Sequence, residues 1–485
     1  MLSVSLWLPL EVREVPVELA GKQVVVVGLA RSGVAAARLC ARQGARVVAT
    51  DRKGPGQLPA EVMSLEKDGV RLELGAHRKE TFASASLIVV SPGVPSDVPE
   101  LQAAREAGVP VLAELELGWR LLRGTAAAVT GTKGKSTTTA AAGAMLREAG
   151  GDVRVGGNIG QALTGIVEGS TAKTVFVLEV SSFQLEGTDT FRPHVAVFLN
   201  LSPDHLDRHA SFEEYAQAKA RIFANQTEED WAVVNAFDPA VLALARRGRA
   251  RKVAFHPLGS GSPALEEAAG AAFFDGAAAR LRANGRDEVL FDRADVHLPG
   301  DHLASDLLAA GATARLMGAA PEDIRRAVRA FAGAEHVLEK VAVIRGVAFF
   351  NDSKATNVEA ALKSLEAFAS PVLPILGGRY KGGDFALLAP ALRARGKAVL
   401  AIGEATPRIA EALAGVVPVV PCGSMAEAVE RAFALAVAGD TVVLAPACSS
   451  FDMFEDYAAR GLAFKDEVRR LVESSGDAGA RTPDG

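Results

Sequence analysis

Short apolar runs alternate with alanine-rich, helix-like stretches along most of the chain. Runs rich in Val, Ile and Leu occur at residues 24–27, 87–90, 174–179, 195–200 and 441–446. Apolar runs this short, separated by helical patterns, are typical of parallel strands that helices cover on both faces. The pattern therefore predicts an α/β fold built on parallel sheets.

Two breaks in the alternation divide the chain into three segments. One α/β unit ends near residues 109–113, and a second ends near residues 331–335, after which a new strand pattern starts. At roughly 150 residues per domain, a chain of 485 residues is expected to form about three domains. We therefore predict domains at residues 1–113, 114–333 and 334–485.

Local signals refine the second segment and the two ends. Asp-Gly at 275–276 and Asn-Gly at 284–285 predict hairpin turns, because such turns need positive φ, and together they indicate an antiparallel annex. The apolar stretch within residues 1–15 has no basic leader and no small-residue cleavage site, so we interpret it as a strand. The tail, about residues 474–485, has no apolar periodicity and is expected to be disordered.

Composition narrows the class of protein. The chain is 49% hydrophobic and 23% charged, and no apolar run approaches the roughly 18 residues of a membrane helix. A net charge of -5 gives no general attraction for nucleic acid. The three cysteines form no C-x-x-C pair, which argues against a disulfide framework or a cysteine zinc site. We expect a cytoplasmic protein that acts on small molecules, with neither nucleic acid nor membrane as a partner.

A first glycine motif, GLARSG, stands at residues 28–33, directly after the first apolar run. Such a turn, with Asp51 ending the next strand to bind a ribose hydroxyl, is typical of dinucleotide sites. Ala30 replaces the glycine that lets a pyrophosphate approach the backbone. From the motif alone, a nicotinamide site and a tight turn that binds nothing both remain open.

A second motif, VTGTKGKSTT at residues 129–138, joins a strand-like run to a helical pattern. Backbone N–H groups of such a loop cradle phosphates, Lys135 would reach the terminal phosphate, and the Ser136 hydroxyl would bind magnesium. The strict pattern has glycine at the position of Val129, and here the first glycine is Gly131. The displaced glycine argues against an ordinary kinase loop.

The second motif resembles the loop of the Mur ligase family, the ATP-dependent amide-bond-forming enzymes of peptidoglycan precursor synthesis, to which folylpolyglutamate synthase is related. Other stretches resemble the central domain of that family: GGNIG at 156–160, LEVSSFQLE at 178–186, NLSPDHLDRH at 200–209 and AQAKARIF at 216–223. Three later stretches resemble its D-glutamate-adding branch: NDSKATN at 351–357, LGGRYKGGDF at 376–385 and PACSSFDMF at 446–454. The D-N-P-R stretch expected of the diaminopimelate-adding branch does not occur in the sequence.

This resemblance implies three α/β domains: an N-terminal Rossmann-like domain, a central P-loop ATPase-like domain with a parallel sheet, and a C-terminal Rossmann-like domain. It implies a monomer that uses ATP and Mg²⁺ to add D-glutamate to UDP-N-acetylmuramoyl-L-alanine through an acyl phosphate. Three alternatives stay open: a ligase of this kind with another amino acid, a nicotinamide-dependent dehydrogenase, and a regulator that holds ATP without turning it over.

The resemblance also assigns site residues. Expected ATP-binding residues are Gly131, Thr132, Lys133, Gly134, Lys135, Ser136, Thr137, His302 and Asp306. Expected UDP-substrate-binding residues are Gly28, Leu29, Ala30, Arg31, Ser32, Gly33, Asp51, Arg52, Ser91, Pro92, Gly93, Asn158, Ser181 and Gln184. Expected amino-acid-binding residues are Lys354, Thr356, Lys381, Ser450 and Tyr457. Expected metal ligands are Ser136, Glu179, His205 and Lys219 as a carbamate, and expected catalytic residues are Lys135, His205, Lys219 and Lys354.

Several of these residues have a simpler interpretation. Asn158, Ser181 and Gln184 could cap turns, and Lys219 could be an exposed cation on an amphipathic helix. A carbamate there would need a lysine whose ammonium form is disfavoured by burial or by neighbouring cations. His205 has the i,i+4 spacing of zinc ligands with a second histidine, but H-E-x-x-H is absent, so the magnesium interpretation is favoured.

Four positions depart from the family pattern. Lys133 stands where asparagine is common, Leu303 and Asp306 stand where asparagine is usual, and Val337 stands where arginine usually follows the histidine. The last three fall on stretches that contact the nucleotide in the family. These departures bear on adenine and ribose contacts and leave the carboxylate chemistry intact.

Overall fold

The computed structural model describes residues 17–95, 97–205, 208–256, 268–298 and 301–475, and for residues 301 and 302 it describes the backbone alone. The strand expected within residues 1–15 lies outside the described residues. The tail was expected from about residue 474, but helix α18 runs through Ser475, and the rest of the tail lies outside the described residues. Among the described helices, none is long and apolar enough to cross a membrane.

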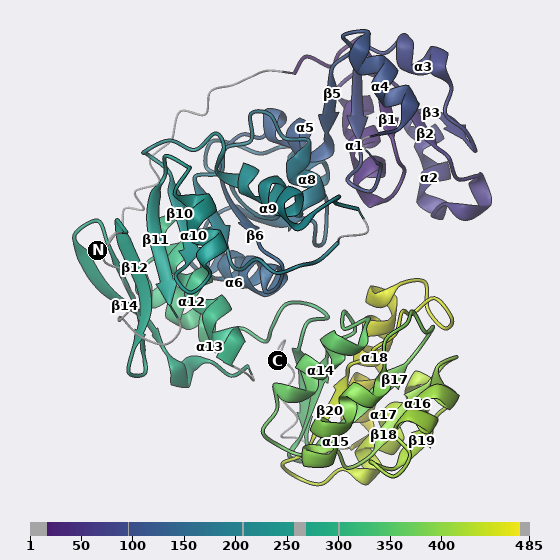
Figure 1. The fold of residues 1–485 in the computed structure, drawn as a ribbon, viewed down its shortest axis with the longest axis vertical. Coiled ribbons are helices and arrows are strands. Elements are labelled where there is room, and N and C mark those ends of the chain that lie inside the picture. The colour runs from purple at the N-terminus through teal and green to yellow at the C-terminus, as the bar shows by residue number, and fades with distance from the viewer. Residues whose placement is uncertain (1–16, 96, 206–207, 257–267, 299–300, 476–485) are drawn as a thin grey trace. The chain divides into compact units, whose positions relative to one another are not determined.

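The chain forms two compact units, which are described separately. The first comprises residues 1–293 and 306–328, and the second comprises residues 294–305 and 329–485. The described residues form three sheets, two in the first unit and one in the second (Figure 1).

The first sheet is five-stranded and wholly parallel, in the order β3-β2-β1-β4-β5. Its strands are β1 (Gln23–Val27), β2 (Arg46–Asp51), β3 (Arg71–Leu74), β4 (Leu87–Val90) and β5 (Val111–Ala113). Its helices are α1 (Arg31–Arg42), α2 (Ala60–Ser64), α3 (Lys79–Ala83), α4 (Pro99–Glu106) and α5 (Glu114–Leu121). The strand order reverses between β1 and β4, and ligands of open α/β sheets bind at such a reversal, beyond the carboxyl ends of the strands.

The second sheet has nine strands, in the order β14-β13-β12-β11-β10-β9-β6-β8-β7. They are β6 (Thr125–Thr130), β7 (Val153–Gly157), β8 (Val175–Glu179), β9 (Val195–Phe198), β10 (Trp231–Asn235), β11 (Arg251–His256), β12 (Gly270–Asp275), β13 (Ala278–Ala283) and β14 (Arg286–Asp292). The helices of this segment are α6 (Lys135–Glu148), α7 (Leu163–Ile166), α8 (Ser182–Glu186), α9 (Phe212–Ala220), α10 (Pro239–Ala245), α12 (Asp301–Leu316) and α13 (Pro321–Ala330).

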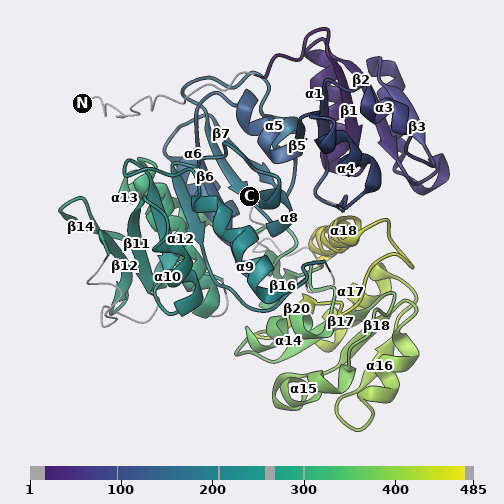
Figure 2. The same ribbon diagram turned by 45° about the horizontal axis from the view of Figure 1, so that its top comes forward.

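The predicted antiparallel annex is confirmed at one edge of this sheet. Strand β13 pairs antiparallel with β12 and with β14, and Figures 1 and 2 show β12 and β14 on the side of β11 away from β6. The turns use backbone that favours glycine or asparagine: φ is +60° at Gly276, +52° at Asn284 and +73° at Gly285. The two dipeptides therefore form hairpin turns, as their sequence predicts.

The third sheet has six strands, in the order β15-β16-β20-β17-β18-β19. They are β15 (Glu339–Ile344), β16 (Val347–Asn351), β17 (Val372–Gly377), β18 (Val399–Ile402), β19 (Val419–Pro421) and β20 (Thr441–Leu444), and only the β15–β16 pair is antiparallel. The helices are α14 (Val358–Glu366), α15 (Ala389–Arg395), α16 (Thr406–Ala412), α17 (Met425–Leu435) and α18 (Tyr457–Ser475).

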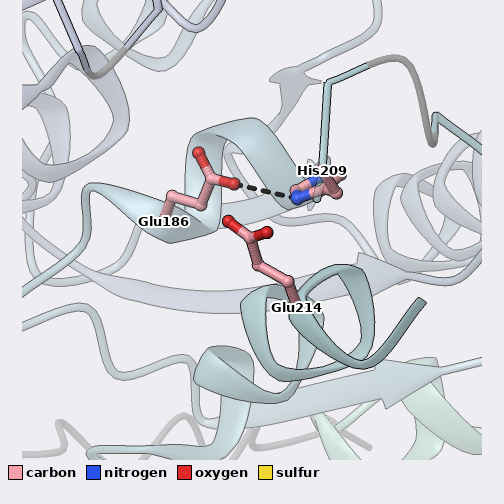
Figure 3. Close-up of side chains that lie close together, drawn as sticks. All are labelled: Glu186, His209 and Glu214. Carbon is pink, nitrogen blue, oxygen red and sulfur yellow. Dashed lines mark ion pairs between the residues drawn. The ribbon is translucent and has the colours of Figure 1, made fainter. Parts of the chain in front are cut away.

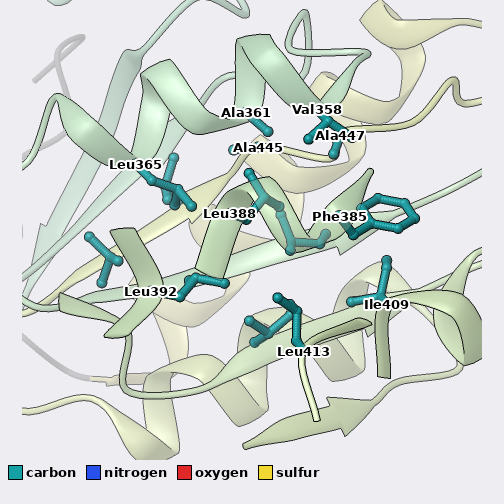
Figure 4. Close-up of a cluster of buried hydrophobic side chains, with 14 of the residues drawn as sticks. Val358, Ala361, Leu365, Phe385, Leu388, Leu392, Ile409, Leu413, Ala445 and Ala447 are labelled. Carbon is teal, nitrogen blue, oxygen red and sulfur yellow. The ribbon is translucent and has the colours of Figure 1, made fainter. Parts of the chain in front are cut away.

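Buried side chains cover both faces of the third sheet. One cluster packs Leu365, Leu388, Leu392 and Ile409 of the helical layer against the strands, and it is drawn in Figure 4. A second cluster on the opposite face includes residues of α17 and α18. A mostly parallel sheet with helices on both faces is the doubly wound architecture. The predicted α/β fold with parallel sheets is therefore confirmed.

Candidate active site

The phosphate loop explains the displaced glycine. Val129 is fully buried within β6, where it pairs with Glu179 of β8 and with Val197 of β9. At Gly131 the backbone has a φ of +152°, and a Cβ atom there would lie 3.1 Å from the Cβ of Leu199. Position 129 thus holds a buried strand residue, and the glycine is needed at position 131, where the chain leaves the strand.

Asn200, two residues after the end of β9, holds the phosphate loop in place. Its Oδ1 accepts N–H bonds from Thr132 (3.1 Å) and Lys133 (2.8 Å), and its Nδ2 donates to the Lys133 carbonyl (3.0 Å). The Thr132 hydroxyl lies 3.2 Å from the hydroxyl of Tyr215 on α9. The exposed Lys133 thus takes part in the loop through its backbone.

Two side chains meet Glu179 at the end of strand β8: Ser136, at the start of α6, and Asn158, directly after β7. The Ser136 hydroxyl donates to Glu179 Oε2 over 2.6 Å, and Asn158 Nδ2 donates to Glu179 Oε1 over 2.7 Å. The Glu179 side chain is buried, so both carboxylate oxygens are hydrogen-bonded in a protected position. Lys135 Nζ donates to the carbonyls of Gly131 (3.0 Å) and Thr132 (2.9 Å). The structure thus brings together the loop, its serine and the predicted metal-binding glutamate.

The side chain of Lys219 extends from α9 to the phosphate loop. It is almost completely buried, and its Nζ donates to the Gly131 carbonyl over 2.8 Å. Burial, and after it the charge of Lys135, lowers the pKa of Lys219 from 10.5 to about 7, while Asp204 and Glu179 act in the opposite direction. The interpretation of Lys219 as an exposed surface cation is therefore wrong.

The two histidines of the predicted segment have different surroundings. His205 has a φ of +54°, and half of its side chain is exposed. Its ring meets the ring of Phe183 edge-on, with 5.2 Å between the centroids. His209 is buried, stacks on Phe183 at 5.1 Å, and has its pKa lowered chiefly by burial. Among the described residues, the cluster of possible metal ligands that contains His209 does not contain His205.

The departures in α12 have separate explanations. Leu303 is buried in the core of the second unit, where an apolar side chain fits. Asp306 is buried in the first unit, and a Cβ atom at Gly134 would lie 2.4 Å from its Oδ1. Burial raises the pKa of Asp306 well above its usual value, which favours a neutral carboxyl group at the position usually held by asparagine. The side chain of His302 lies outside the described residues.

Asp51 and two glycines shape the turn between β1 and α1. Asp51 Oδ2 accepts the N–H of Leu29 (2.8 Å), and its Oδ1 accepts the N–H of Lys53 (2.9 Å). The φ of Gly28 is +85°, and a Cβ atom at Gly33 would lie 1.8 Å from the Gly28 carbonyl oxygen. Asp51 therefore fixes the turn in this structure, and its predicted contact with the substrate stays a prediction.

Neighbouring predicted residues gather around this turn. The Ser91 hydroxyl donates to the Gly28 carbonyl over 2.7 Å, which joins the turn of residues 91–94 to the glycine motif. Arg31 Nη1 donates to the Gly160 carbonyl over 3.3 Å, so the first turn of α1 reaches the GGNIG stretch. These contacts place the predicted residues of the first two sheets near one another within the first unit.

The serine and glutamine after β8 also cap a helix. The Ser181 N–H donates to Gln184 Oε1 (3.0 Å), and the Gln184 N–H donates to Ser181 Oγ (3.3 Å). This reciprocal pair is a capping box at the start of α8. The simpler interpretation of these two residues is thus borne out, and their predicted role toward the substrate stays untested.

The predicted amino-acid-binding residues lie after the carboxyl ends of three neighbouring strands. Lys354 and Thr356 follow β16, Lys381 follows β17, and Ser450 follows β20, with Tyr457 starting α18. Strands β16, β20 and β17 are adjacent and parallel, so these loops meet at one edge of the third sheet.

Arg460, which the sequence did not single out, joins two of these loops. It is 1% exposed, its Nε and Nη2 donate to the hydroxyl and carbonyl of Ser353, and its Nη1 donates to the Cys448 carbonyl. The Ser353 hydroxyl in turn donates to the Tyr457 carbonyl. No motif signals this role, because an arginine on a helix is usually solvent-exposed and only the tertiary fold buries this one.

A phosphate loop, a buried glutamate hydrogen-bonded to the loop serine, and a mostly parallel sheet whose strand β6 leads into that loop define a nucleotide-binding α/β protein of the P-loop class. Comparison with known families gives the finer assignment. Residues 22–113 match the N-terminal domain of MurD-like Mur ligases, residues 129–314 match the Mur ligase middle domain, and residues 336–448 match the Mur ligase glutamate ligase domain. The chain belongs to the Mur ligase family, as its resemblance predicted.

Individual relatives extend this similarity over nearly the whole chain. The UDP-N-acetylmuramoylalanine--D-glutamate ligase of Acidobacterium capsulatum is 46% identical over 93% of this chain and 97% of its own length. The enzyme of the same name from Myxococcus xanthus is 44% identical over 94% of this chain and 99% of its own.

Solved structures support the fold. UDP-N-acetylmuramate-alanine ligase MurC from Thermotoga maritima has a TM-score of 0.58 at 19% identity, over 93% of this chain and all of that one. MurF ligase from the same organism, in complex with ADP, has a TM-score of 0.53 at 16% identity, over 94% of this chain and 96% of that one. The predicted arrangement of Rossmann-like, P-loop ATPase-like and Rossmann-like parts is confirmed by this likeness and by the family matches.

Proposed function

We propose that this chain is an ATP-dependent ligase that adds D-glutamate to the carboxylate of UDP-N-acetylmuramoyl-L-alanine. The observation that carries the proposal is the meeting of Ser136, Glu179, Lys135 and the buried Lys219 around Gly131. These groups suit phosphoryl transfer to a carboxylate, and relatives that align over nearly the whole chain bear the name of this ligase.

A carboxylate is a poor electrophile, so the reaction first activates it by phosphorylation. The substrate carboxylate attacks the γ-phosphorus of ATP, ADP leaves, and an acyl phosphate forms. The neutral amine of D-glutamate then attacks the acyl carbon, and the tetrahedral intermediate collapses with loss of inorganic phosphate. Lys135 would stabilise the charge on the transferred phosphoryl group, because a P-loop lysine reaches the terminal phosphate.

The side chains around Glu179 fit a magnesium ion. They offer hydroxyl and carboxylate oxygens, which this hard cation prefers, and the Ser136 hydroxyl already lies against the Glu179 carboxylate. Ser136, Glu179, His205 and the carbamate of Lys219 would hold the ion. When bound, Mg²⁺ supplies positive charge that offsets the crowd of phosphate and carboxylate oxygens.

The substrates are assigned to the three parts of the chain by the same proposal. Residues 1–113 bind the UDP group through the Gly28–Gly33 turn, residues 114–333 bind ATP, and residues 334–485 bind D-glutamate. Lys354 and Lys381 supply positive charge for the two carboxylates of the amino acid, as charge-assisted hydrogen bonds require. The enzyme acts as a cytoplasmic monomer.

Substrate-dependent release of phosphate tests the function. Purified protein is given ATP, Mg²⁺ and UDP-N-acetylmuramoyl-L-alanine with D-glutamate, L-glutamate, L-lysine or meso-diaminopimelate. The proposal predicts rapid release with D-glutamate alone. Equal or faster release with lysine or diaminopimelate would assign another amino acid, and no release with any of them would contradict a ligase.

A further inference from the structure

Three side chains outside the proposed magnesium site point toward one another. Glu186 ends α8, His209 precedes α9, and Glu214 lies in the first turn of α9 (Figure 3). One ligand atom from each lies within 4.8 Å of the others, and His209 Nδ1 is 3.1 Å from Glu186 Oε1. Glu186 and Glu214 are exposed while His209 is buried, so the group opens toward solvent on its carboxylate side.

The His209 ring is fixed with one nitrogen facing the two carboxylates. Its Nε2 lies 3.0 Å from the Ser182 hydroxyl, and its ring stacks on Phe183 with an angle of 7° between the planes. The buried Nδ1 makes no hydrogen bond of acceptable geometry with the residues that the structure describes. If Nε2–H donates to Ser182, a lone pair on Nδ1 faces Glu186, and either a proton or a metal ion held by both groups relieves the repulsion.

We propose that Glu186, His209 and Glu214 bind one divalent transition-metal ion, such as Zn²⁺, at a site separate from that of Glu179. One imidazole nitrogen with two carboxylates in a tetrahedral arrangement suits Zn²⁺ or its neighbours, whereas Mg²⁺ favours an octahedral shell made mostly of oxygen and water. The Ser182 contact matches the usual pattern, in which the second nitrogen of a metal-bound histidine donates to a protein oxygen.

The observed spacing is close to what such an ion needs. Ligand bonds of about 2.1 Å in a tetrahedral arrangement put ligand atoms roughly 3.4 Å apart. The distance of 3.1 Å between His209 Nδ1 and Glu186 Oε1 is already close to this separation. The ligand atom of the exposed Glu214, whose carboxylate accepts the Ala210 N–H, lies within 4.8 Å of the other two and would move inward by at most about 1.4 Å, a change within the reach of its rotatable bonds.

An ion at this site would join α8 to α9. Helix α8 begins three residues after Glu179, and α9 carries Lys219. The ion would therefore hold together the two helices next to these proposed magnesium ligands, without touching the substrates. The role is positioning and stability. It does not depend on which amino acid the enzyme adds.

Zinc binding by the full-length protein tests the proposal. The chain is freed of metal with a chelator and kept in excess Mg²⁺, so that the oxygen-rich site is saturated, and Zn²⁺ is then titrated by calorimetry. One equivalent should bind, Co²⁺ should show the intense visible absorption of a low-coordinate site, and Zn²⁺ should raise the melting temperature.

Matched variants locate the ion. Glu186→Gln and Glu214→Gln should each weaken Zn²⁺ binding by at least about 10-fold. Glu213→Gln, which changes the adjacent exposed carboxylate on the same turn of α9, should bind Zn²⁺ normally, and so should Glu179→Gln. The proposal is overturned if no Zn²⁺ binds, if Glu186→Gln and Glu214→Gln bind it normally, or if Glu179→Gln abolishes binding.

Discussion

Replacing Lys219 tests whether its unusual environment serves carbamate formation. Carbon dioxide adds to the neutral amine, and the pKa of Lys219 is lowered from 10.5 to about 7 by burial and by Lys135. At pH 7 the neutral fraction of an ordinary lysine is about 0.03%, whereas a pKa of about 7 makes it about one half, a gain of roughly 1,000-fold. The product is an anion, which would suit a magnesium site.

Two substitutions separate an anion from a cation at position 219. Lys219→Ala should lower kcat by at least ~100-fold and regain part of it when a small carboxylate such as acetate is added. Lys219→Arg should stay inactive with or without acetate, because a guanidinium remains charged and cannot form the carbamate. Phosphate release measures both variants, and circular dichroism checks that each one folds.

The carbamate itself can be observed by ¹³C NMR. Wild-type protein equilibrated with ¹³C-bicarbonate should show a carbamate resonance that is absent from Lys219→Arg and Lys219→Ala. Full activity of Lys219→Arg would refute the reasoning, because it would show that a positive charge suffices. An active wild-type enzyme without the resonance under turnover conditions would refute it as well.

Three further substitutions test other parts of the account. Lys135→Ala should lower kcat by at least ~100-fold if the lysine stabilises the transferred phosphoryl group, and near-normal kcat in phosphate release would contradict that role. Asp306→Asn should raise the melting temperature more at pH 8 than at pH 4.5. Because the pKa of Asp306 is higher in the folded than in the unfolded protein, the wild type loses stability as the pH rises above the unfolded pKa, whereas asparagine does not titrate. An equal change in melting temperature at both pH values would contradict this. Arg460→Met should lower the free energy of unfolding in urea by about 2–4 kcal/mol because it leaves buried carbonyls unpaired, and an unchanged midpoint would show that the contacts contribute little.

Local signals account for the parts of the fold that the sequence predicts well. Apolar runs such as residues 87–90 become strands with nearly the predicted bounds, because both faces of each run are buried. The turn at 284–285 forms because asparagine and glycine tolerate positive φ. The shift of glycine to position 131 is likewise visible in the sequence, although its reason, the approach of Leu199, needs the structure.

Features that depend on tertiary packing could not be read from the sequence. Nothing around Lys219 shows its burial, and nothing marks Arg460 as the link between Ser353 and Cys448. The grouping of His209 with carboxylates from two helices arises only when α8 and α9 pack together. The two boundaries between the three expected domains stay predictions: the described residues form three sheets but two compact units, with Leu303 in the core of the second unit.

Transfer of oxygen from substrate to phosphate tests the acyl phosphate most directly. UDP-N-acetylmuramoyl-L-alanine labelled with ¹⁸O in both oxygens of its alanine carboxylate is incubated with the enzyme, ATP, Mg²⁺ and D-glutamate. The account predicts that each phosphate released carries one ¹⁸O atom, since the bridging oxygen leaves with phosphorus when the amine displaces it, and that the amide product retains the other. Unlabelled phosphate, or label that appears in AMP, would contradict it.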